Sequence, residues 1–178
     1  MRKVLVLLGL VFLIVTCAKA QKAPTFDVAG TYEYIHLTGD NCNGFGANAA
    51  ANVNHWLGIV GDFGFCNDTS LPTGFTSHYT NYLFGPRVSF RNYGRLVPYA
   101  QFLLGGAHST FNGTPPGSLN TSANTFAYTL GAGTDIRLTP HISFRLIQFE
   151  YLHTDFGGTK QNNMRMETGL VYHFGGNK

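Results

Sequence analysis

Eight segments of this chain alternate between apolar and polar residues with the two-residue period of a β-strand. The segments cover 26–38, 45–53, 56–66, 78–91, 96–109, 124–138, 142–153 and 163–174. Short and long connections alternate between these segments along the sequence. The short ones are 54–55, 92–95 and 139–141, and the long ones are 39–44, 67–77, 110–123 and 154–162. This regularity predicts eight antiparallel strands, with the short turns and both termini at one rim and the long loops at the other.

The polarity of the alternation is the reverse of what a water-soluble barrel needs. In segment 78–91, for example, Tyr82, Phe84 and Val88 share one face, and Arg87 and Arg91 lie on the other. An eight-stranded barrel encloses little more than its own side chains, so this many large apolar residues cannot all point inward. Lipid on the aromatic side resolves the conflict. The fold class predicted is all-β, an eight-stranded antiparallel up-and-down transmembrane β-barrel.

The charged residues support this assignment. After residue 20 the chain holds nine acidic and nine basic residues, and no apolar run is long enough for a membrane-spanning helix. Seven of the eighteen fall in termini, loops or turns: Lys22, Asp40, Asp68, Arg95, Asp155, Lys160 and Lys178. Alternation assigns the other eleven to the barrel interior: Asp27, Glu33, Asp62, Arg87, Arg91, Asp135, Arg137, Arg145, Glu150, Arg165 and Glu167.

Six acids and five arginines are nearly balanced, which predicts a lumen filled by ion pairs, because an unpaired buried charge is costly. Arg87 and Arg137 are accordingly expected to neutralise buried carboxylates. One strand breaks the pattern, since Arg145 and Glu150 have opposite parity. Either a β-bulge lies between them, or Arg145 extends to the interface at the short-turn rim.

The N-terminus has the pattern of a secretion signal. Arg2 and Lys3 precede an apolar run over 4–16, and Ala18-Lys19-Ala20 is a small-x-small cleavage site. We predict a signal peptide over 1–20 and a barrel domain over 21–178, the alternative being lipidation at Cys17. Loss of the signal's basic residues leaves no net formal charge, so the basic pI is no evidence for nucleic-acid binding.

The chain resembles the outer-membrane β-barrel superfamily of OmpA-, OmpX- and opacity-type domains over about 24–174. The resemblance rests on "FDVAGTYEYIHL", "LFGPRVSFR", "VPYAQFLLGGAH", "FAYTLGAGTDIRL", "FRLIQFEYLHTDFGG" and "RMETGLVYHF". It implies an outer-membrane location after export. It also implies an assembly signal at Leu170, Tyr172 and Phe174, from which the four residues after Phe174 depart.

Candidate sites are few. Cys42 in the first long loop and Cys66 at the end of the third strand predict a disulfide at the long-loop rim, the alternative being two free thiols. Seven histidines divide between the rims, and those near the long loops could form a metal or pH-responsive site or simply tolerate a wet interface. They are His36, His78, His108 and His153 at the long-loop rim, and His55, His141 and His173 at the other.

Motifs for catalysis or cofactor binding are missing from the sequence. There is no nucleotide loop, no HExxH and no CxxC. His141-Ile142-Ser143 resembles the His-x-Ser pair of barrels that deacylate lipid A, but it follows a short turn on the wrong rim and has no evident acid partner. We therefore expect a structural turn, no enzyme activity, no cofactor and no bound metal.

These features favour a non-enzymatic barrel with a structural or surface-interaction role. The alternative is a narrow porin-like conductor of small solutes or ions, and a lipid-modifying enzyme is a more distant hypothesis. The expected partners are outer-membrane lipid and lipopolysaccharide, and the barrel-assembly machinery during insertion. We expect a monomer that binds no nucleic acid, and the sequence names no external ligand.

Overall fold

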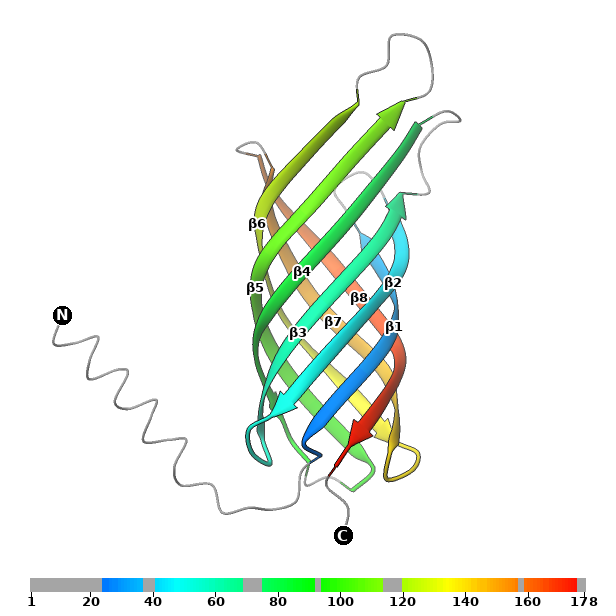
Figure 1. Ribbon diagram of the computed structural model, residues 1–178, viewed down its shortest axis with the longest axis vertical. Helices are drawn as coiled ribbons and strands as arrows, with labels where there is room; N and C mark the ends of the chain where they lie inside the picture. Colours follow the sequence, from blue (N-terminus) through cyan, green and yellow to red (C-terminus); the bar gives the residue numbers. More distant parts are fainter. Residues whose placement is uncertain are drawn as a thin grey trace, which may run out of the picture.

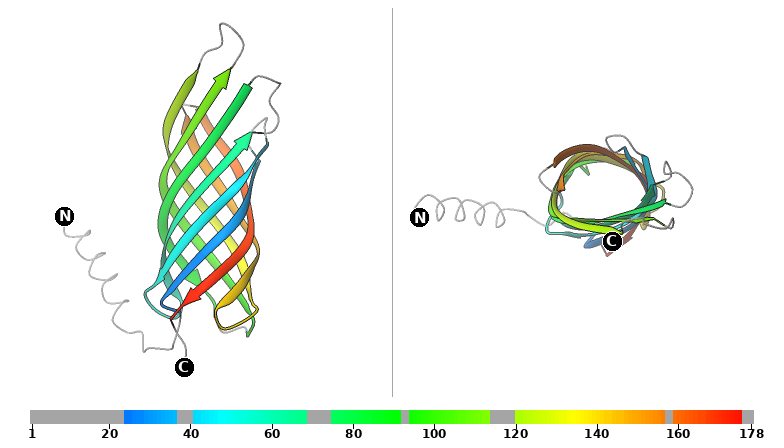
Figure 2. Two further views of the ribbon diagram at one scale, coloured as in Figure 1. Left: turned by 45° about the vertical axis from the view of Figure 1, so that its right-hand side comes forward. Right: turned by 90° about the horizontal axis from the view of Figure 1, so that it is seen from above.

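The computed structural model describes residues 24–36, 41–68, 75–91, 94–113, 120–156 and 159–175, and the predicted signal segment lies outside them. Eight antiparallel strands close into one barrel in which each strand pairs with the next and the last pairs with the first (Figures 1 and 2). The predicted fold class is confirmed. The strands are β1 (Phe26–His36), β2 (Asn41–Asn52), β3 (Leu57–Asp68), β4 (Phe75–Ser89), β5 (Leu96–Gly113), β6 (Thr121–Arg137), β7 (Ile142–Phe156) and β8 (Thr159–Phe174).

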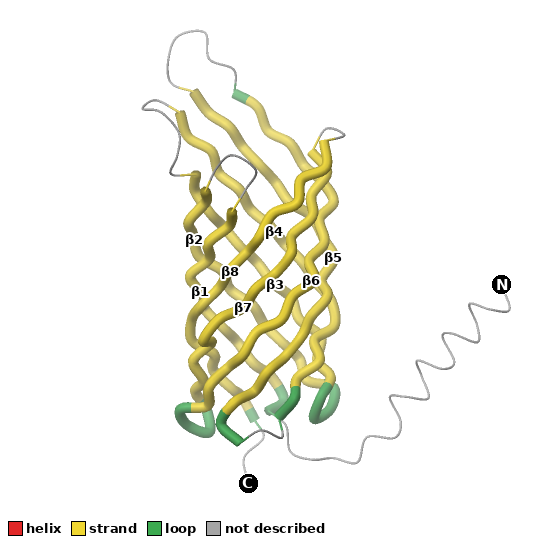
Figure 3. The backbone as a smooth tube through the Cα atoms, turned by 180° about the vertical axis from the view of Figure 1, so that it is seen from behind, coloured by secondary structure: helices red, strands yellow, loops and turns green. Residues whose placement is uncertain are grey.

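The connections 53–56 and 138–141, and residues 90–91 and 94–95 between β4 and β5, lie at the end of the barrel that also holds Pro24 and the last residues of β8 (Figure 3). We call this end the inner rim and the opposite end the outer rim. Side chains shape the turns locally, because Oδ1 of Asn54 accepts bonds from the backbone nitrogens of Trp56 and Leu57. In the last turn Oγ1 of Thr139 accepts from the nitrogen of Ile142.

The strands reach further toward the outer rim than alternation predicts. β2 begins at Asn41, β5 ends at Gly113 and β6 begins at Thr121. All three strands therefore include residues that we expected to be in loops. The predicted loop position of Cys42 is therefore wrong, because the residue lies in β2. The reason is that hydrogen bonding between neighbouring strands continues through small and polar residues that show no clear alternation.

The outer face of the barrel is apolar, as the reversed polarity requires. Phe45, Phe84, Phe126, Leu130 and Leu170 each expose more than half of their surface. Among the described residues no helix is long and apolar enough to cross a membrane. The exposed apolar side chains of the strands form the surface that a hydrocarbon layer would contact.

A β-bulge in β7 decides between the two alternatives for Arg145. The pairing of β7 with β8 shifts between Arg145 and Gln148. Leu146 and Ile147 both face outward, with 50% and 37% of their surface exposed, whereas Arg145 and Gln148 are fully buried. The extra residue restores inward parity, so Arg145 and Glu150 both point into the lumen.

Candidate functional site: the charged lumen and its inner-rim pocket

The structure places all eleven predicted interior charges on the inner face of the barrel. Ten of them are buried, and Arg137 is half-buried near the inner rim. These charges do not form the near-complete set of ion pairs that we expected. The charges separate into an acidic group around Arg165 and a basic group near the inner rim.

Arg165 lies at the centre of the acidic group, which we call the Arg165 cluster. Nη1 of Arg165 lies 2.8 Å from Oδ1 of Asp62 and 3.4 Å from Oε2 of Glu33. Its Nε lies 2.6 Å from Oε2 of Glu150 and 3.3 Å from Oε1 of Glu167. One guanidinium is thus in ion-pairing distance of four carboxylates from four strands, and all five residues are buried. The geometry ties β1, β3, β7 and β8 together across the lumen.

Gly64 makes room for this cluster. A Cβ at this position would lie 2.4 Å from Oε2 of Glu33 and 2.5 Å from Nδ2 of Asn81. Asn81 in turn accepts a 3.0 Å bond from Nη1 of Arg165. A side chain at residue 64 would therefore displace the groups that surround the guanidinium.

Neutral side chains join the two groups of charges. Gln101 accepts a 2.7 Å bond from Nε of Arg87 and donates one of 2.5 Å to Glu150. The hydroxyl of Tyr99 donates a 2.6 Å bond to Gln148. The Tyr99 ring also contacts two cations, with the guanidinium carbons of Arg87 and Arg145 at 4.6 and 5.1 Å from its centroid.

The basic group holds four arginines and two aspartates. Asp135 accepts a 3.0 Å bond from Nε of Arg145, and Asp27 lies 3.4 Å from Nη2 of Arg91. Among the described residues no carboxylate lies within 4.0 Å of the guanidinium of Arg87 or Arg137. The expectation that these two arginines neutralise buried carboxylates is wrong. Alternation assigns a side chain to a face but does not say which inward groups meet.

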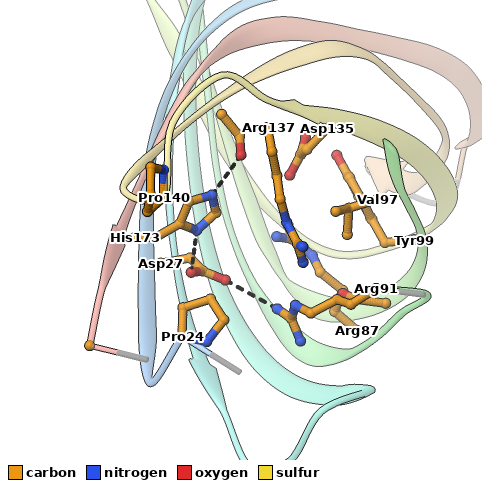
Figure 4. Close-up of a pocket in the computed structure, with 13 residues that line it drawn as sticks. Pro24, Asp27, Arg87, Arg91, Val97, Tyr99, Asp135, Arg137, Pro140 and His173 are labelled. Atoms are coloured by element: carbon orange, nitrogen blue, oxygen red, sulfur yellow. Dashed lines mark hydrogen bonds and ion pairs between the residues drawn. The ribbon is translucent and has the colours of Figure 1, made fainter. Parts of the chain in front are cut away.

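A cavity of about 250 Å³ opens among these residues at the inner rim, and we call it the inner-rim pocket (Figure 4). Burial lowers the pKa of Arg91, which lies in the turn after β4, and the nearby Asp27 carboxylate opposes that effect. The residues that line the pocket are Pro24, Asp27, Arg87, Ser89, Arg91, Val97, Tyr99, Asp135, Arg137, Pro140, Ser143, His173 and Gly175.

One wall of the inner-rim pocket carries a chain of hydrogen bonds that sequence reasoning missed. Oγ of Ser143 lies 2.7 Å from Nε2 of His173, and Nδ1 of His173 lies 2.7 Å from Oδ1 of Asp27 (Figure 4). This is the bond order of a Ser-His-Asp triad. The predicted neighbour His141 is not the partner of Ser143. The available signal was barrel closure, because pairing of the first and last strands places Asp27 opposite His173.

The outer end of the lumen is largely apolar. The buried cluster there includes Ile35, Tyr79 and Leu152, and the polar residues Thr154 and Asn163 are buried there as well. Cys42 and Cys66 belong to the same cluster and are joined by a disulfide between β2 and β3, with at most 1% of either residue exposed. Apolar side chains thus make up most of the packing in the lumen toward the outer rim.

The four outer histidines lie on the outside of the barrel rather than in a common site. Each donates from Nδ1 to Oδ1 of an asparagine opposite it on the paired strand, at 2.5 to 2.8 Å. We call the eight residues the His/Asn ring, and they are His36, Asn41, Asn67, His78, His108, Asn124, His153 and Asn162. Stacking of His153 on Tyr128 at 4.9 Å and of His78 on Phe65 at 5.9 Å adds an apolar contact.

The His/Asn ring lies at one height. The length of strand between the inner rim and the ring runs from Phe26 to His36 in β1 and from Leu96 to His108 in β5. At roughly 3.3 Å per residue and a tilt near 40°, that is about 25–30 Å above the inner rim, the height of the apolar band of a transmembrane barrel. No Asp, Glu, Lys or Arg of the described strands faces outward between the inner rim and this ring. The ring therefore marks the outer interface.

The remaining predicted sites are the assembly signal on β8 and a metal site. Leu170, Tyr172 and Phe174 alternate outward on β8, and their role as an assembly signal stays a prediction. Within the described ranges no three His, Cys, Asp or Glu side chains are grouped so as to hold a metal ion.

Comparison with solved structures gives the same architecture. Neisserial surface protein A has a TM-score of 0.61 at 12% identity, covering 84% of this chain and 96% of that one. OprG from Pseudomonas aeruginosa has a TM-score of 0.54 at 14% identity, covering 89% and 99%. Ail, the attachment invasion locus protein of Yersinia pestis, has a TM-score of 0.53 at 14% identity, covering 82% and 95%. At these identities the likeness shows the fold alone.

No curated protein matches the sequence. The model of the family described as outer membrane protein beta-barrel domain matches residues 5–174. That match covers nearly the whole chain and agrees with the closed barrel and its apolar outer face. The chain therefore belongs to the outer membrane protein β-barrel domain family, and it is a transmembrane protein of the outer membrane.

Proposed function

We propose that this protein is a non-conducting, non-enzymatic barrel that serves a structural or surface-interaction role in the outer membrane. The observation that carries the proposal is the filled lumen. Arg165, Gln148 and Leu103 are fully buried at mid-barrel, Arg145 is fully buried nearer the inner rim, and Ile35 and Leu152 are fully buried nearer the outer rim. A conducting path would need to displace both a bonded ionic layer and an apolar layer.

The outer end of the barrel supports a role at the cell surface. β5 continues from His108 to Gly113, and β6 begins at Thr121, so this hairpin extends past the His/Asn ring (Figure 1). Five residues of tilted strand add about 12 Å beyond the interface. The aromatic side chains of Phe75 and Phe111 stack with their centroids 5.7 Å apart, and this contact joins β4 to the extension. Ordered strands above the membrane offer a surface that a partner outside the cell can contact.

Burial of the serine favours a non-enzymatic role for the triad-like chain. Ser143 lies in the wall of the inner-rim pocket but exposes none of its surface to solvent, and its neighbours in the sheet are paired strands whose backbone N–H groups already donate to carbonyls. An acyl-transfer site needs a reachable nucleophile and free donors for the oxyanion. In the proposed role the hydrogen bonds from Ser143 through His173 orient Asp27 at the inner rim.

Planar-bilayer recording of the refolded full-length barrel tests the proposal. We expect no discrete openings from the wild type. An Arg165→Gly variant, confirmed as folded by its heat-modifiable migration, removes the centre of the plug and serves as the control for detection of a conducting lumen. Discrete wild-type openings would contradict the proposal and favour the narrow conductor. Mass spectrometry of lipid A from cells with and without the protein tests for lipid modification, and a mass change would contradict the non-enzymatic role.

A further inference from the structure

We propose that the inner-rim pocket is a binding site for a small phosphate-type oxyanion at the periplasmic mouth of the barrel, held by Arg87 and Arg137. The site goes beyond the structural role, and it does not depend on whether the lumen conducts. It rests on a local excess of positive charge in the basic group, which holds four arginines against two aspartates.

The two aspartates of the pocket are already occupied. Oδ1 of Asp27 accepts from His173 at 2.7 Å, and Oδ2 accepts from Nδ2 of Asn52 at 2.8 Å and contacts Arg91 at 3.4 Å. Asp135 accepts from Arg145 at 3.0 Å. The direct contacts of both carboxylates are therefore with neighbours other than Arg87 and Arg137.

Arg87 is the more constrained of the two remaining cations. It exposes 5% of its surface, its Nε donates to Gln101, and its Nη2 has no hydrogen-bond partner among the described residues. The face of the guanidinium packs on Tyr99. A buried guanidinium with an unused N–H is unfavourable unless an acceptor completes it, and an oxyanion is the acceptor that suits its planar donors best.

In the proposed site Arg137 supplies the second contact to the oxyanion. It is half-buried, lines the same cavity, and lies opposite Ser143 in the pairing of β6 with β7 (Figure 4). Neither arginine has a carboxylate within 4.0 Å among the described residues, and the basic group of four arginines and two aspartates has a local excess of two formal positive charges. A phosphate monoester carries about −1.5 to −2 at pH 7, which matches that excess.

The size of the cavity limits the ligand. About 250 Å³ is room for several waters at roughly 30 Å³ each, or for one oxyanion with part of its hydration. The pocket opens inside the mouth and not on the lipid-facing surface, since its lining residues lie on the inner face of the strands or in the turns and chain ends at the inner rim. Phosphate could arrive as the free ion or as the phosphate group of a headgroup, and the two sources share the same recognition chemistry.

Isothermal titration of the refolded full-length barrel, in detergent and chloride buffer, tests the site. Inorganic phosphate is the first probe, and glycerol 3-phosphate is a soluble stand-in for a lipid headgroup. We expect saturable one-to-one binding of inorganic phosphate. Arg87→Gln and Arg137→Gln should each weaken it about tenfold or more, as loss of a charge-assisted hydrogen bond requires. Arg95→Gln is the matched control, because Arg95 is an exposed arginine at the same rim.

Each outcome bears on the proposal. Binding of inorganic phosphate alone supports the free ion as ligand, and equal or tighter binding of glycerol 3-phosphate supports a phosphate group carried by a larger molecule. Heat-modifiable migration checks that each variant is folded, and Arg137→Gln keeps the proposal testable if Arg87→Gln does not fold. Absence of saturable binding to folded wild type, or equal affinity in wild type and both pocket variants, overturns the site.

Discussion

Nη1 of Arg165 in β8 lies 2.8 Å from Oδ1 of Asp62 in β3, although the two strands are not neighbours in the sheet. The contact therefore joins walls of the barrel that backbone hydrogen bonds do not connect. It is one of four carboxylate contacts of the same buried guanidinium.

Replacement of Arg165 should be the most damaging change among the interior charges. Arg165→Met leaves four buried carboxylates without their cation, and loss of one partner from a buried pair typically costs about 3–5 kcal/mol. Urea unfolding followed by heat-modifiable gel migration measures the effect. Arg95→Met, an exposed change in a turn, should alter the free energy of unfolding by no more than about 0.5 kcal/mol. Equal midpoints for the two variants would mean that water solvates the interior charges independently.

Arg137→Met should be much milder than Arg165→Met, even though alternation assigns both arginines to the lumen. Arg137 is half-buried and has no carboxylate within 4.0 Å among the described residues, so its removal leaves no orphaned anion. We expect a change within about 1 kcal/mol in phosphate-free buffer, measured by the same urea assay. A loss as large as that of Arg165→Met would show that Arg137 neutralises a carboxylate after all.

The disulfide between Cys42 and Cys66 should stabilise the barrel through the unfolded state. The two cysteines are 24 residues apart, and closure of a loop of that length is worth about 3.5 kcal/mol in the chain-entropy model. The Cys42→Ala, Cys66→Ala double variant should therefore unfold at lower urea. Because the bridge is buried, a reductant should act on the wild type only in urea. Rapid reduction of the folded wild type would contradict the buried position.

The depth of an outward-facing position should set the cost of a charge there. Leu130 lies midway along the outer face of β6, and Asn162 belongs to the His/Asn ring. We expect Leu130→Arg to cost about 2–4 kcal/mol and Asn162→Arg about 0–1 kcal/mol in lipid vesicles. Unfolding of vesicle-inserted barrels in urea measures both. Similar losses at the two positions would place the interface elsewhere.

Gly64→Val should disturb the Arg165 cluster without removal of any charge. The new side chain would occupy the space that Glu33 and Asn81 use beside the guanidinium. We expect a loss of about 1–3 kcal/mol from overpacking. Gly61→Val is the matched control, because nothing lies within 4 Å of a Cβ at Gly61. A Gly64 variant as stable as the Gly61 variant would show that the cluster shifts at little cost.

The sequence by itself determined the number of strands, the rim of each turn and the face of nearly every side chain. These properties are local, because alternation follows from the two-residue period of a strand, and lipid on one side and a closed lumen on the other sort polar from apolar residues. The outer positions of Phe84 and Leu130 and the inner positions of Glu33 and Arg165 needed nothing more.

Only the tertiary structure decided which inward groups meet. The bulge at Leu146 and Ile147 lets Arg145 and Glu150 both point into the lumen, and closure of β1 on β8 brings Asp27 to His173 from the two ends of the chain. Four carboxylates gather on Arg165 while Arg87 and Arg137 receive none, although all are simply inward-facing in the alternation pattern. The physical reason is that a face depends on local backbone geometry, whereas an ion pair depends on strand register, stagger and the reach of side chains across the lumen.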